Sequence, residues 1–322
     1  MNYKIAKAEQ RYLQECISIF YEDYNEVCQS NHLVPRLENN DFITSQLTDL
    51  INCGLGFVAL LDDKVVGYIT GWPVNEFFGT ANGVFVPLFG HGAVKEGRTK
   101  IYQSLYSYAS EMWVEKELIN HVITMFCVDK ECIDSWVLLG FGNRCNDAIR
   151  NTDALPEFKV CGNYSVLKVD KVHISDIIEL CLQDYRHFKK APAFMVGHDK
   201  SEEDIMKDFK EWLSQDNHHL WVAYDDGKAI GYMRIQETGE SFISAYSDMM
   251  NITGAFVDEK YRGKGVSKIL LDNILSWLKQ KGYYLCGVDY ESINVTGSNF
   301  WNKYFKPYTY TMVRYVDNRI LK

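Results

Sequence analysis

The chain repeats part of its own pattern, and this repeat limits its possible folds more than any other feature. Residues 57–68, FVALLDDKVVGY, align with residues 221–232, WVAYDDGKAIGY, at a constant offset of 164 and without a gap. Each segment has an apolar run, an acidic turn and a second apolar run that contains glycine, which is typical of a β-hairpin. A repeat of this kind indicates one structural unit that occurs twice.

Nearly the same offset recurs near the ends of the two halves. It separates two further pairs of residues, Trp136 and Trp301, and Arg150 and Arg314. The length of 322 residues is also typical of two domains. We therefore predict one domain over residues 1–155 and a second over residues 164–322, joined by a segment with Asn, Asp, Pro and Gly.

Both halves show the same order of expected elements. A strand and two helices precede the hairpin, and a strand, a long helix, another strand and a short helix follow it. The long helices are expected at about residues 98–116 and 266–280, and apolar residues recur in the second at helical spacing. The predicted fold class is α/β, with two tandem copies that each hold a twisted, mixed but mostly antiparallel sheet flanked by helices.

A loop that suits an anion precedes the second long helix. Residues 262–267 read Arg-Gly-Lys-Gly-Val-Ser and connect a predicted strand to that helix. Gly263 and Gly265 allow the backbone to approach a ligand closely, and the free N–H groups of a helix start favour an anion. Arg262 and Lys264 add positive charge, and Ser267 can cap the helix or bind a phosphate oxygen. We predict a diphosphate site; the alternative is a glycine-containing turn before a surface helix.

Two segments of the second half resemble motifs of the GCN5-related N-acetyltransferase (GNAT) family. The loop resembles its motif A, Q/R-x-x-G-x-G/A, because Arg262 and Gly265 match and Ser267 replaces the usual Gly or Ala. Residues 294–303, NVTGSNFWNK, resemble the family segment N-x-x-A-x-x-F-Y-x-K, with Trp301 in place of Tyr. The resemblance covers about residues 165–316, so the chain resembles a tandem GNAT protein.

The first half fits the family topology but not motif A. An alignment of residues 83–86 with residues 254–257 places His91 opposite Arg262 and Val94 opposite Gly265. The loop would then lack the cation and the second glycine. We predict a degenerate copy that binds coenzyme A poorly and supports the fold or shapes the acceptor pocket.

The resemblance implies a direct transfer from acetyl-CoA, as co-substrate, to the amine of an unidentified acceptor that we expect to be a small molecule. Backbone N–H groups near Phe256 and Val257 would polarise the thioester carbonyl. Asn294 would contact the pantetheine arm. No metal is expected. The full set of predicted cofactor contacts is Phe256, Val257, Arg262, Gly263, Lys264, Gly265, Val266, Ser267, Asn294 and Trp301.

The residues that move protons are less well defined by the sequence. The family's usual acid is the Tyr that Trp301 replaces, and an indole cannot protonate a thiolate. Tyr304, about one helical turn on, is a candidate acid, or it packs beside Trp301. Asp289, at the end of a predicted strand, is a candidate base or amine anchor, or it caps the next loop.

Composition and net charge limit the classes of binding partner that we expect. The net charge of −9 argues against nonspecific nucleic-acid binding and tilts toward a cationic amine. The first fifteen residues resemble no signal peptide, no apolar run reaches membrane length, and the nine cysteines form no zinc pattern. We expect a cytoplasmic protein without membrane partners, as a monomer or homodimer. The rival function is a non-catalytic sensor or regulatory protein that binds coenzyme A.

Overall fold

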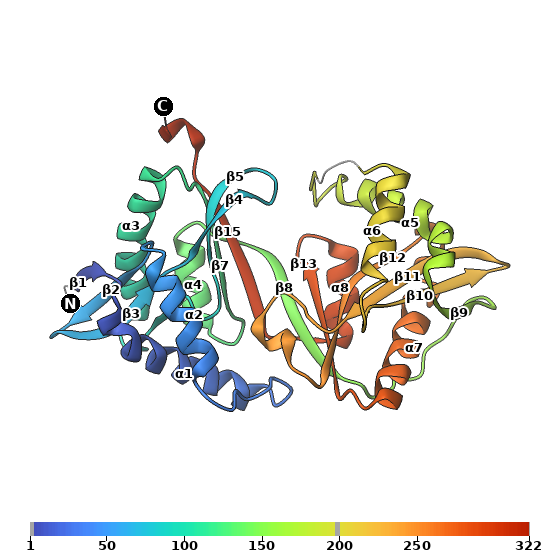
Figure 1. Cartoon of the computed structure of the whole chain (residues 1–322), viewed down its shortest axis with the longest axis horizontal. Helices are drawn as coiled ribbons and strands as arrows, with labels where there is room; N and C mark the ends of the chain where they lie inside the picture. Colours follow the sequence, from blue (N-terminus) through green and yellow to red (C-terminus); the bar gives the residue numbers. More distant parts are fainter. Residues whose placement is uncertain (1–2, 197–199, 322) are drawn as a thin grey trace. The chain divides into compact units, whose positions relative to one another are not determined.

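The computed structural model describes residues 3–196 and 200–321, which form two compact units. The first unit comprises Met1–Asn146 together with Tyr308–Lys322, and the second comprises Asp147–Pro307. Figure 1 follows the chain from blue to red. These units differ from the predicted domains of residues 1–155 and 164–322 chiefly in the last strand, which lies in the first unit.

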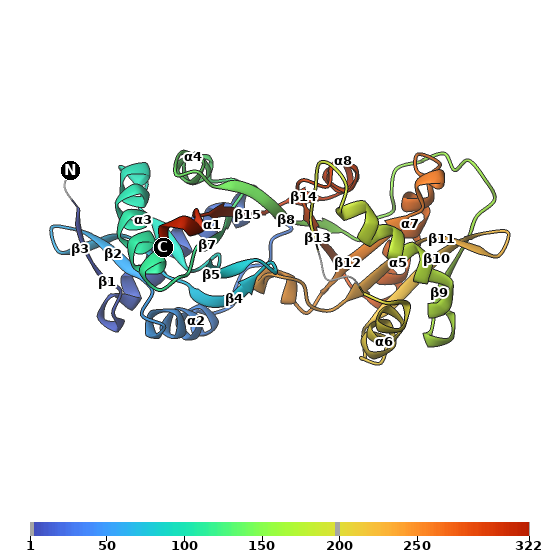
Figure 2. The same cartoon turned by 90° about the horizontal axis from the view of Figure 1, so that it is seen from above.

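The first unit contains strands of two sheets together with helices. Its elements are β1 (Lys4–Lys7), α1 (Leu13–Ser30), α2 (Asp41–Asn52), β2 (Phe57–Leu61), β3 (Lys64–Ile69), β4 (Trp72–Phe77), β5 (Ala81–Val86), β6 (His91–Ala93), α3 (Arg98–Glu115), β7 (Asn120–Phe126), α4 (Lys130–Leu138) and the start of β8 (Gly142–Asn151). One sheet has the order β1-β2-β3-β6, and β5 pairs in parallel with β7 in the other. Figure 2 shows α3 and α4 on one side of the strands and α2 on the other.

The second unit contains one sheet between two layers of helices. Its elements are β9 (Ser165–Val169), α5 (Ile174–Phe188), α6 (Glu202–Trp212), β10 (His219–Asp225), β11 (Lys228–Gln236), β12 (Met249–Val257), α7 (Val266–Lys281), β13 (Leu285–Glu291), α8 (Val295–Tyr304) and β14 (Lys306–Pro307). Its strand order is β8-β13-β12-β11-β10-β9. The apolar stripe of α7, with Leu270, Ile274 and Leu278 fully buried, packs on one face, and α5 with α6 covers the other.

The two predicted hairpins have the same strand register. Ala59 pairs with Gly67 in the first hairpin, and Ala223 pairs with Gly231 in the second, so the paired residues themselves correspond in the sequence alignment. A register shift follows immediately after each of these alanines, again at corresponding positions. The turns also match, because both central residues have positive φ in each, as two-residue hairpin turns require. This agreement in backbone detail supports the duplication inferred from the sequence.

The closing strands are exchanged between the halves. The last strand, β15 (Thr309–Tyr315), belongs to the first unit, where it pairs antiparallel with β7 from Thr309–Phe126 to Tyr315–Asn120. Conversely, residues 147–151 of β8 belong to the second unit, where β8 lies next to β13. Each half of the chain therefore contributes a strand to the unit that the other half builds.

The alignment of residues 83–86 with residues 254–257 is wrong. In the second unit β11 pairs Gly231 with Val257, and the equivalent Gly67 in β3 pairs with Ala93 of β6, not with β5. The next residues along the chain agree with this pairing. Val94 N–H donates to the Val66 carbonyl, and Asp258 N–H donates to the Ile230 carbonyl, so both partners correspond at the offset of 164 residues. The first-unit loop between strand and long helix is therefore residues 94–97, four residues shorter than residues 258–265.

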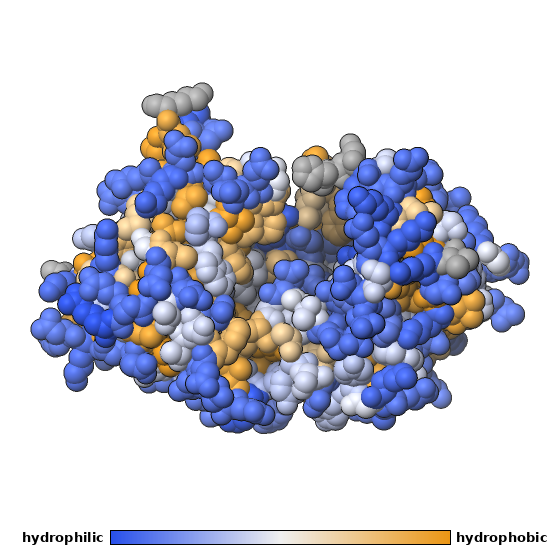
Figure 3. All heavy atoms as spheres, in the orientation of Figure 1, coloured by the Kyte–Doolittle hydropathy of each residue, from blue (hydrophilic) through white to orange (hydrophobic). Residues whose placement is uncertain are grey.

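The described surface of the second unit is largely polar over α5 and α6, as the blue atoms there in Figure 3 show. Across residues 3–196 and 200–321, no helix combines the length and the apolar character that crossing a membrane requires.

Candidate active site

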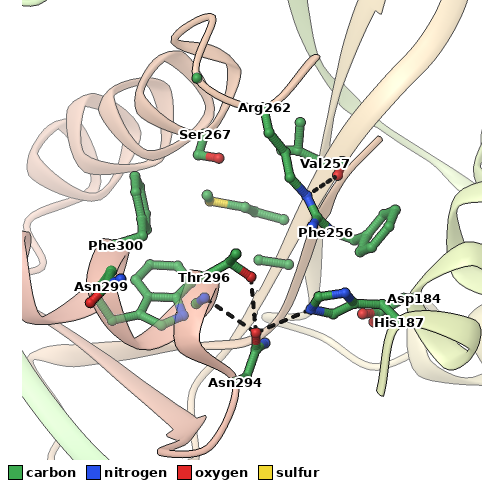
Figure 4. Close-up of a pocket in the computed structure, with 15 residues that line it drawn as sticks. Asp184, His187, Phe256, Val257, Arg262, Ser267, Asn294, Thr296, Asn299 and Phe300 are labelled. Atoms are coloured by element: carbon green, nitrogen blue, oxygen red, sulfur yellow. Dashed lines mark hydrogen bonds between the residues drawn. The ribbon is translucent and has the colours of Figure 1, made fainter. Parts of the chain in front are cut away.

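Two parallel strands of the second unit separate and open a cleft. β12 pairs with β13 from Met249–Leu285 to Ile252–Val288 only, whereas it continues along β11 as far as Val257. Beyond this point lies a cleft of about 400 Å³, bounded by α5, the end of β12, the start of α7 and α8. Figure 4 shows Asp184 and His187 on one side of this cleft and Ser267 and Phe300 across from them.

The predicted anion loop forms the turn between β12 and α7. Gly263 and Gly265 have φ values of 75° and 94°, which lie in the left-handed region that favours glycine. The N–H groups of Gly263, Gly265, Val266 and Ser267 donate to no backbone acceptor within residues 3–196 and 200–321. These donors, together with the positive end of the α7 dipole, provide what a phosphate group requires.

The two loop glycines have different surroundings. A Cβ at Gly265 would lie 2.7 Å from the Lys159 carbonyl oxygen, because the segment before β9 packs over the loop. Cys161 N–H also donates to the Lys264 carbonyl, at 2.9 Å. At Gly263 a Cβ would meet no atom of the described residues within 4 Å. The loop is thus braced at Gly265 and open to a ligand at Gly263.

The charged side chains of the loop do not all face the cleft. Arg262 lines it, but its Nε donates to the Val257 carbonyl at 3.3 Å and its guanidinium lies 5.5 Å from the centre of the Phe256 ring. Lys264 lies against Tyr261 and is not among the cleft residues. Of the predicted contacts, the structure brings together at the cleft Phe256, Val257, Arg262, Gly263, Ser267, Asn294 and Trp301, while Lys264, Gly265 and Val266 form the loop behind it.

Of the two predicted carbonyl-polarising N–H groups, one faces the opening between the strands. Asp258 N–H donates to Ile230 in β11, so the alternation of an antiparallel ladder directs the N–H of Phe256 to β11 as well. The N–H of Val257 then points to the other side, toward the separation of β12 from β13. Val257 is therefore the better placed donor for a developing oxyanion.

Asn294 fixes the start of α8 at the edge of the cleft. Its Oδ1 accepts from the N–H of Gly297 at 3.3 Å and caps the helix. The same oxygen accepts from Thr296 Oγ1 at 3.0 Å and lies 3.1 Å from Nε2 of His187 on α5 (Figure 4). The side chain thereby holds α8 against α5 across the cleft.

A second cavity, here called the chamber, adjoins the cleft in the same unit. Its volume is about 260 Å³, and its walls combine carboxylates with aromatic rings. The carboxylates are Asp184, Asp289 and Glu291, the one lining cation among the described residues is Arg234, and the aromatic residues are Tyr185, Phe188, Phe209, Tyr232, Tyr290 and Trp301. Such walls suit a small cation with an apolar part.

The predicted base or anchor, Asp289, lines the chamber. Burial, together with the negative charges of Asp147 and Glu240, raises the pKa of its carboxyl to about 7, against the opposing effects of a backbone hydrogen bond and of Arg234. A cation in the chamber would stabilise the ionised form. The location therefore agrees with an amine-binding role, which stays a prediction.

Asp184 was not singled out in the sequence, yet it lines both the cleft and the chamber. Burial raises the pKa of its carboxyl to about 7, and Arg234, Arg262 and a hydrogen bond from the Tyr232 hydroxyl oppose this shift.

A signal that could have found Asp184 is Asp23, which holds the corresponding place in α1. The strands before the two helices define this correspondence, since Ile5 of β1 faces Ala59 and Val166 of β9 faces Ala223. Counted along the chain, Asp23 follows Ile5 at the same interval at which Asp184 follows Val166. The duplication therefore places a carboxylate at this point of both units.

The predicted acid, Tyr304, is half-buried at the end of α8. Its ring centre lies 5.0 Å from that of Phe300, and it packs against the core of the second unit. It is not among the residues that line the cleft or the chamber. The structure thus favours packing, the alternative to an acid role, which stays a prediction.

The first unit has an ion network in the corresponding place. Gly97, with φ of 73°, precedes α3 as Gly265 precedes α7, so Arg98 corresponds to Val266. Arg98 is buried, and its Nη2 lies 2.9 Å from Asp23 Oδ1, while its Nη1 pairs with Asp129. The cavity beside this network measures only about 10 Å³. His91 is also buried there, bonded to Tyr102 and to the Thr124 carbonyl.

Comparison with known proteins identifies the family of this domain. Residues 180–299 match the sequence model of the acetyltransferase (GNAT) family, so the chain contains a GNAT acetyltransferase domain. An uncharacterized N-acetyltransferase from Methanocaldococcus jannaschii is 24% identical over 139 residues, which are 43% of this chain and 56% of the relative. The chain thus spans about half the length of that curated relative.

The fold of the whole chain also has a solved counterpart. A GCN5-related N-acetyltransferase from Sphaerobacter thermophilus has a TM-score of 0.59 to this structure, at 11% identity, with coverage of 97% of this chain and 95% of the other. At this identity the similarity concerns the fold alone. It confirms the predicted α/β class, and the family model over residues 180–299 confirms the GNAT resemblance.

Proposed function

We propose that the chain is an N-acyltransferase that moves an acetyl group from acetyl-CoA directly to an amine, most simply that of a small molecule. The observation that carries this proposal is the cleft between β12 and β13, with unbonded N–H groups and Gly263 at one end and the acidic, aromatic chamber at the other. One end suits a diphosphate, and the other suits a small cation.

Each part of the site takes one task. The α7 start would hold the diphosphate, Asn294 and Trp301 would line the path of the pantetheine, and Val257 N–H would polarise the carbonyl. The co-substrate supplies an activated acyl thioester. Positioning of the amine in the chamber lowers the entropic barrier to attack. Asp289 would hold the cationic acceptor in the chamber.

The first unit is proposed to be a degenerate copy. Arg98, Asp23 and Asp129 fill the place where the second unit has its cleft, and they already neutralise one another. One acetyl-CoA per chain follows from this arrangement. We further propose a cytoplasmic protein, monomeric or homodimeric, that acts without a metal, a nucleic acid or a membrane partner.

Binding at the loop can be tested with a matched pair of variants on α7. Ser267→Glu places a carboxylate in the cleft beside the predicted diphosphate, and we expect it to weaken acetyl-CoA binding at least 100-fold in calorimetry. Asn273→Glu adds the same charge on the exposed side of the same helix and should leave the dissociation constant within two-fold. Equal binding by both variants would exclude this site.

Turnover separates an enzyme from a sensor. Release of coenzyme A from acetyl-CoA should rise when methylamine, 1,4-diaminobutane or phenethylamine is added to the wild-type chain, and Ser267→Glu should abolish the rise. Tight binding of acetyl-CoA without release with any of these amines would instead support the rival, a sensor or regulatory protein.

A further inference from the structure

Asp184 stands where the cleft meets the chamber. Four residues line both cavities: Asp184, Ala255, Asn294 and Trp301. Within the described residues, Asp184 is the only one of the four whose side chain ionises in water. A thioester in the cleft and an amine in the chamber must meet at this junction, so Asp184 is the carboxylate beside the reacting atoms.

The same position in the first unit carries a carboxylate that is already paired. Asp23 lies 2.9 Å from Arg98, the first residue of α3. In the second unit the first residue of α7 is Val266, which has no charge. Within residues 3–196 and 200–321, Asp184 therefore forms no ion pair like that of Asp23 with Arg98. The second unit keeps the carboxylate and replaces the cation that would neutralise it.

Charged and titratable groups face Asp184 from each neighbouring element. The Tyr232 hydroxyl on β11, Arg234 on β11 and Arg262 before α7 each lower the pKa of Asp184 and so favour its ionised form. Both arginines are engaged elsewhere, Arg234 with the Thr253 carbonyl and Arg262 with that of Val257. The remaining groups in the two linings are Cys181, Tyr185 and His187 on α5, and Asp289, Tyr290 and Glu291 on β13.

We propose that Asp184 accepts the proton of the attacking amine. This inference rests on the proposed function. As the nitrogen–carbon bond forms and the carbon–sulfur bond breaks, one N–H proton passes to the Asp184 carboxylate. The electron pair of the carbon–sulfur bond leaves on sulfur, and the thiolate takes up a proton by way of solvent, which returns Asp184 to its ionised form.

The electrostatics of the junction agree with this role. A carboxylate with an ordinary pKa is a weak base, whereas burial raises the pKa of Asp184 to about 7 and makes its ionised form a stronger base. The ionised form is the base, so its population falls as the pH drops through about 7. Activity that depends on Asp184 should therefore fall below this pH.

The test compares two small amines whose proton loss differs in difficulty. Methylamine is a strong base and needs help to release a proton during attack, whereas methoxyamine is a weak base whose adduct loses a proton to water. Asp184→Asn should lower kcat/KM for methylamine, calculated on the concentration of the neutral amine, about 100-fold and abolish the fall of that constant below pH 7. The loss with methoxyamine should stay below ten-fold.

The matched control is Glu179→Gln, a change of the same kind on the exposed side of α5, where Glu179 pairs with Arg186. It should leave both reactions unchanged. Unaltered acetyl-CoA affinity in Asp184→Asn would show that the cleft is intact, and Asp184→Glu should restore part of the methylamine reaction.

The outcomes separate the two proposals. If Asp184→Asn retains methylamine turnover within three-fold with the same pH profile, the role of Asp184 is wrong while the acyltransferase stands. If the wild-type chain releases coenzyme A no faster than Ser267→Glu with either amine, the proposed function fails, and the inference about Asp184 fails with it.

Discussion

Asp23 and Asp184 hold the same place in the two units, but only Asp23 is paired with an arginine at the start of the following long helix. Both carboxyls have a raised pKa because of burial, to about 6 for Asp23 and about 7 for Asp184. Asp23 therefore belongs to an ion network beside a very small cavity, whereas Asp184 faces the cleft and the chamber.

Removal of Arg98 should destabilise the first unit strongly. Arg98→Met leaves Asp23 and Asp129, whose side chains are 14% and 17% exposed, without this cation, which costs about 3 kcal/mol of the free energy of unfolding. Urea denaturation measures this loss. Lys95→Met, which removes the exposed Lys95–Glu26 pair in the same unit, should cost less than about 1 kcal/mol. Equal effects of the two variants would contradict the structural role of the network.

The stoichiometry of acetyl-CoA binding follows from the same contrast. Calorimetry should give one site per chain, and Ser267→Glu should remove it entirely. The reason is that the first-unit cavity of about 10 Å³ leaves no more room than a single water molecule. A second site that survives in Ser267→Glu would show that the first unit binds the co-substrate.

Local sequence signals predicted the hairpins and the loop correctly. The two-residue turns at Asp62–Asp63 and Asp226–Gly227 have positive φ values. Asp and Gly are residue types that favour such turns, so the sequence alone indicates them. Likewise, Gly265 precedes α7 in a left-handed conformation that glycine accepts at little cost. These features depend on neighbours within a few residues, so one sequence reveals them.

The strand exchange and Asp184 were beyond the reach of such signals. β7 and β15 pair across more than half of the chain, for example through the 2.8 Å hydrogen bond between Thr124 and Thr311, and no local pattern records that pairing. Asp184 is a polar residue on an amphipathic helix, and its position matters only because Val266 replaces the arginine found at Arg98. The first-unit loop was misaligned because β6, and not β5, pairs with β3 where the end of β12 pairs with β11.

Acid should destabilise the first unit through His91. Burial lowers the pKa of His91 to about 4, whereas an unfolded histidine has a pKa near 6.5. The unfolded state therefore binds protons first as the pH falls below about 6.5, and stability is lost between that pH and about 4. The expected loss is about 2 kcal/mol between pH 7 and pH 5.

Urea denaturation of His91→Gln at both pH values tests this expectation. The variant should lose about 2 kcal/mol of the pH dependence, whereas His32→Gln, on the surface of the same unit, should retain it. An unchanged pH dependence in His91→Gln would mean that other groups, such as the buried His121, account for the acid sensitivity.

Tyr304→Phe separates the two roles that the sequence left open. The change keeps the ring against Phe300 and removes only the hydroxyl. Because Tyr304 lines neither cavity, we expect kcat to change less than two-fold. A fall of about 100-fold with an unchanged KM for acetyl-CoA would instead establish Tyr304 as the acid. Steady-state kinetics with 1,4-diaminobutane distinguishes the two.

Asp289 is expected to bind the acceptor and to leave proton transfer to Asp184. Its carboxyl lines the chamber but not the cleft, so it can hold a cationic group of the acceptor away from the reacting carbonyl. Asp289→Asn should therefore raise KM for 1,4-diaminobutane about ten-fold while kcat changes less than three-fold. For methoxyamine, which is uncharged at neutral pH, both constants should be nearly unchanged.

The pH profile completes the distinction between the two carboxylates. Burial and the charge of Asp147 raise the pKa of Asp289 to about 7, close to that of Asp184. The fall of wild-type kcat below pH 7 therefore does not by itself identify which of the two carboxylates causes it. If Asp184 is the base, Asp289→Asn retains the fall in kcat below pH 7 and Asp184→Asn loses it. The reverse pattern would make Asp289 the base and Asp184 the anchor. The base must be ionised for proton transfer, so its removal abolishes the fall in kcat below pH 7.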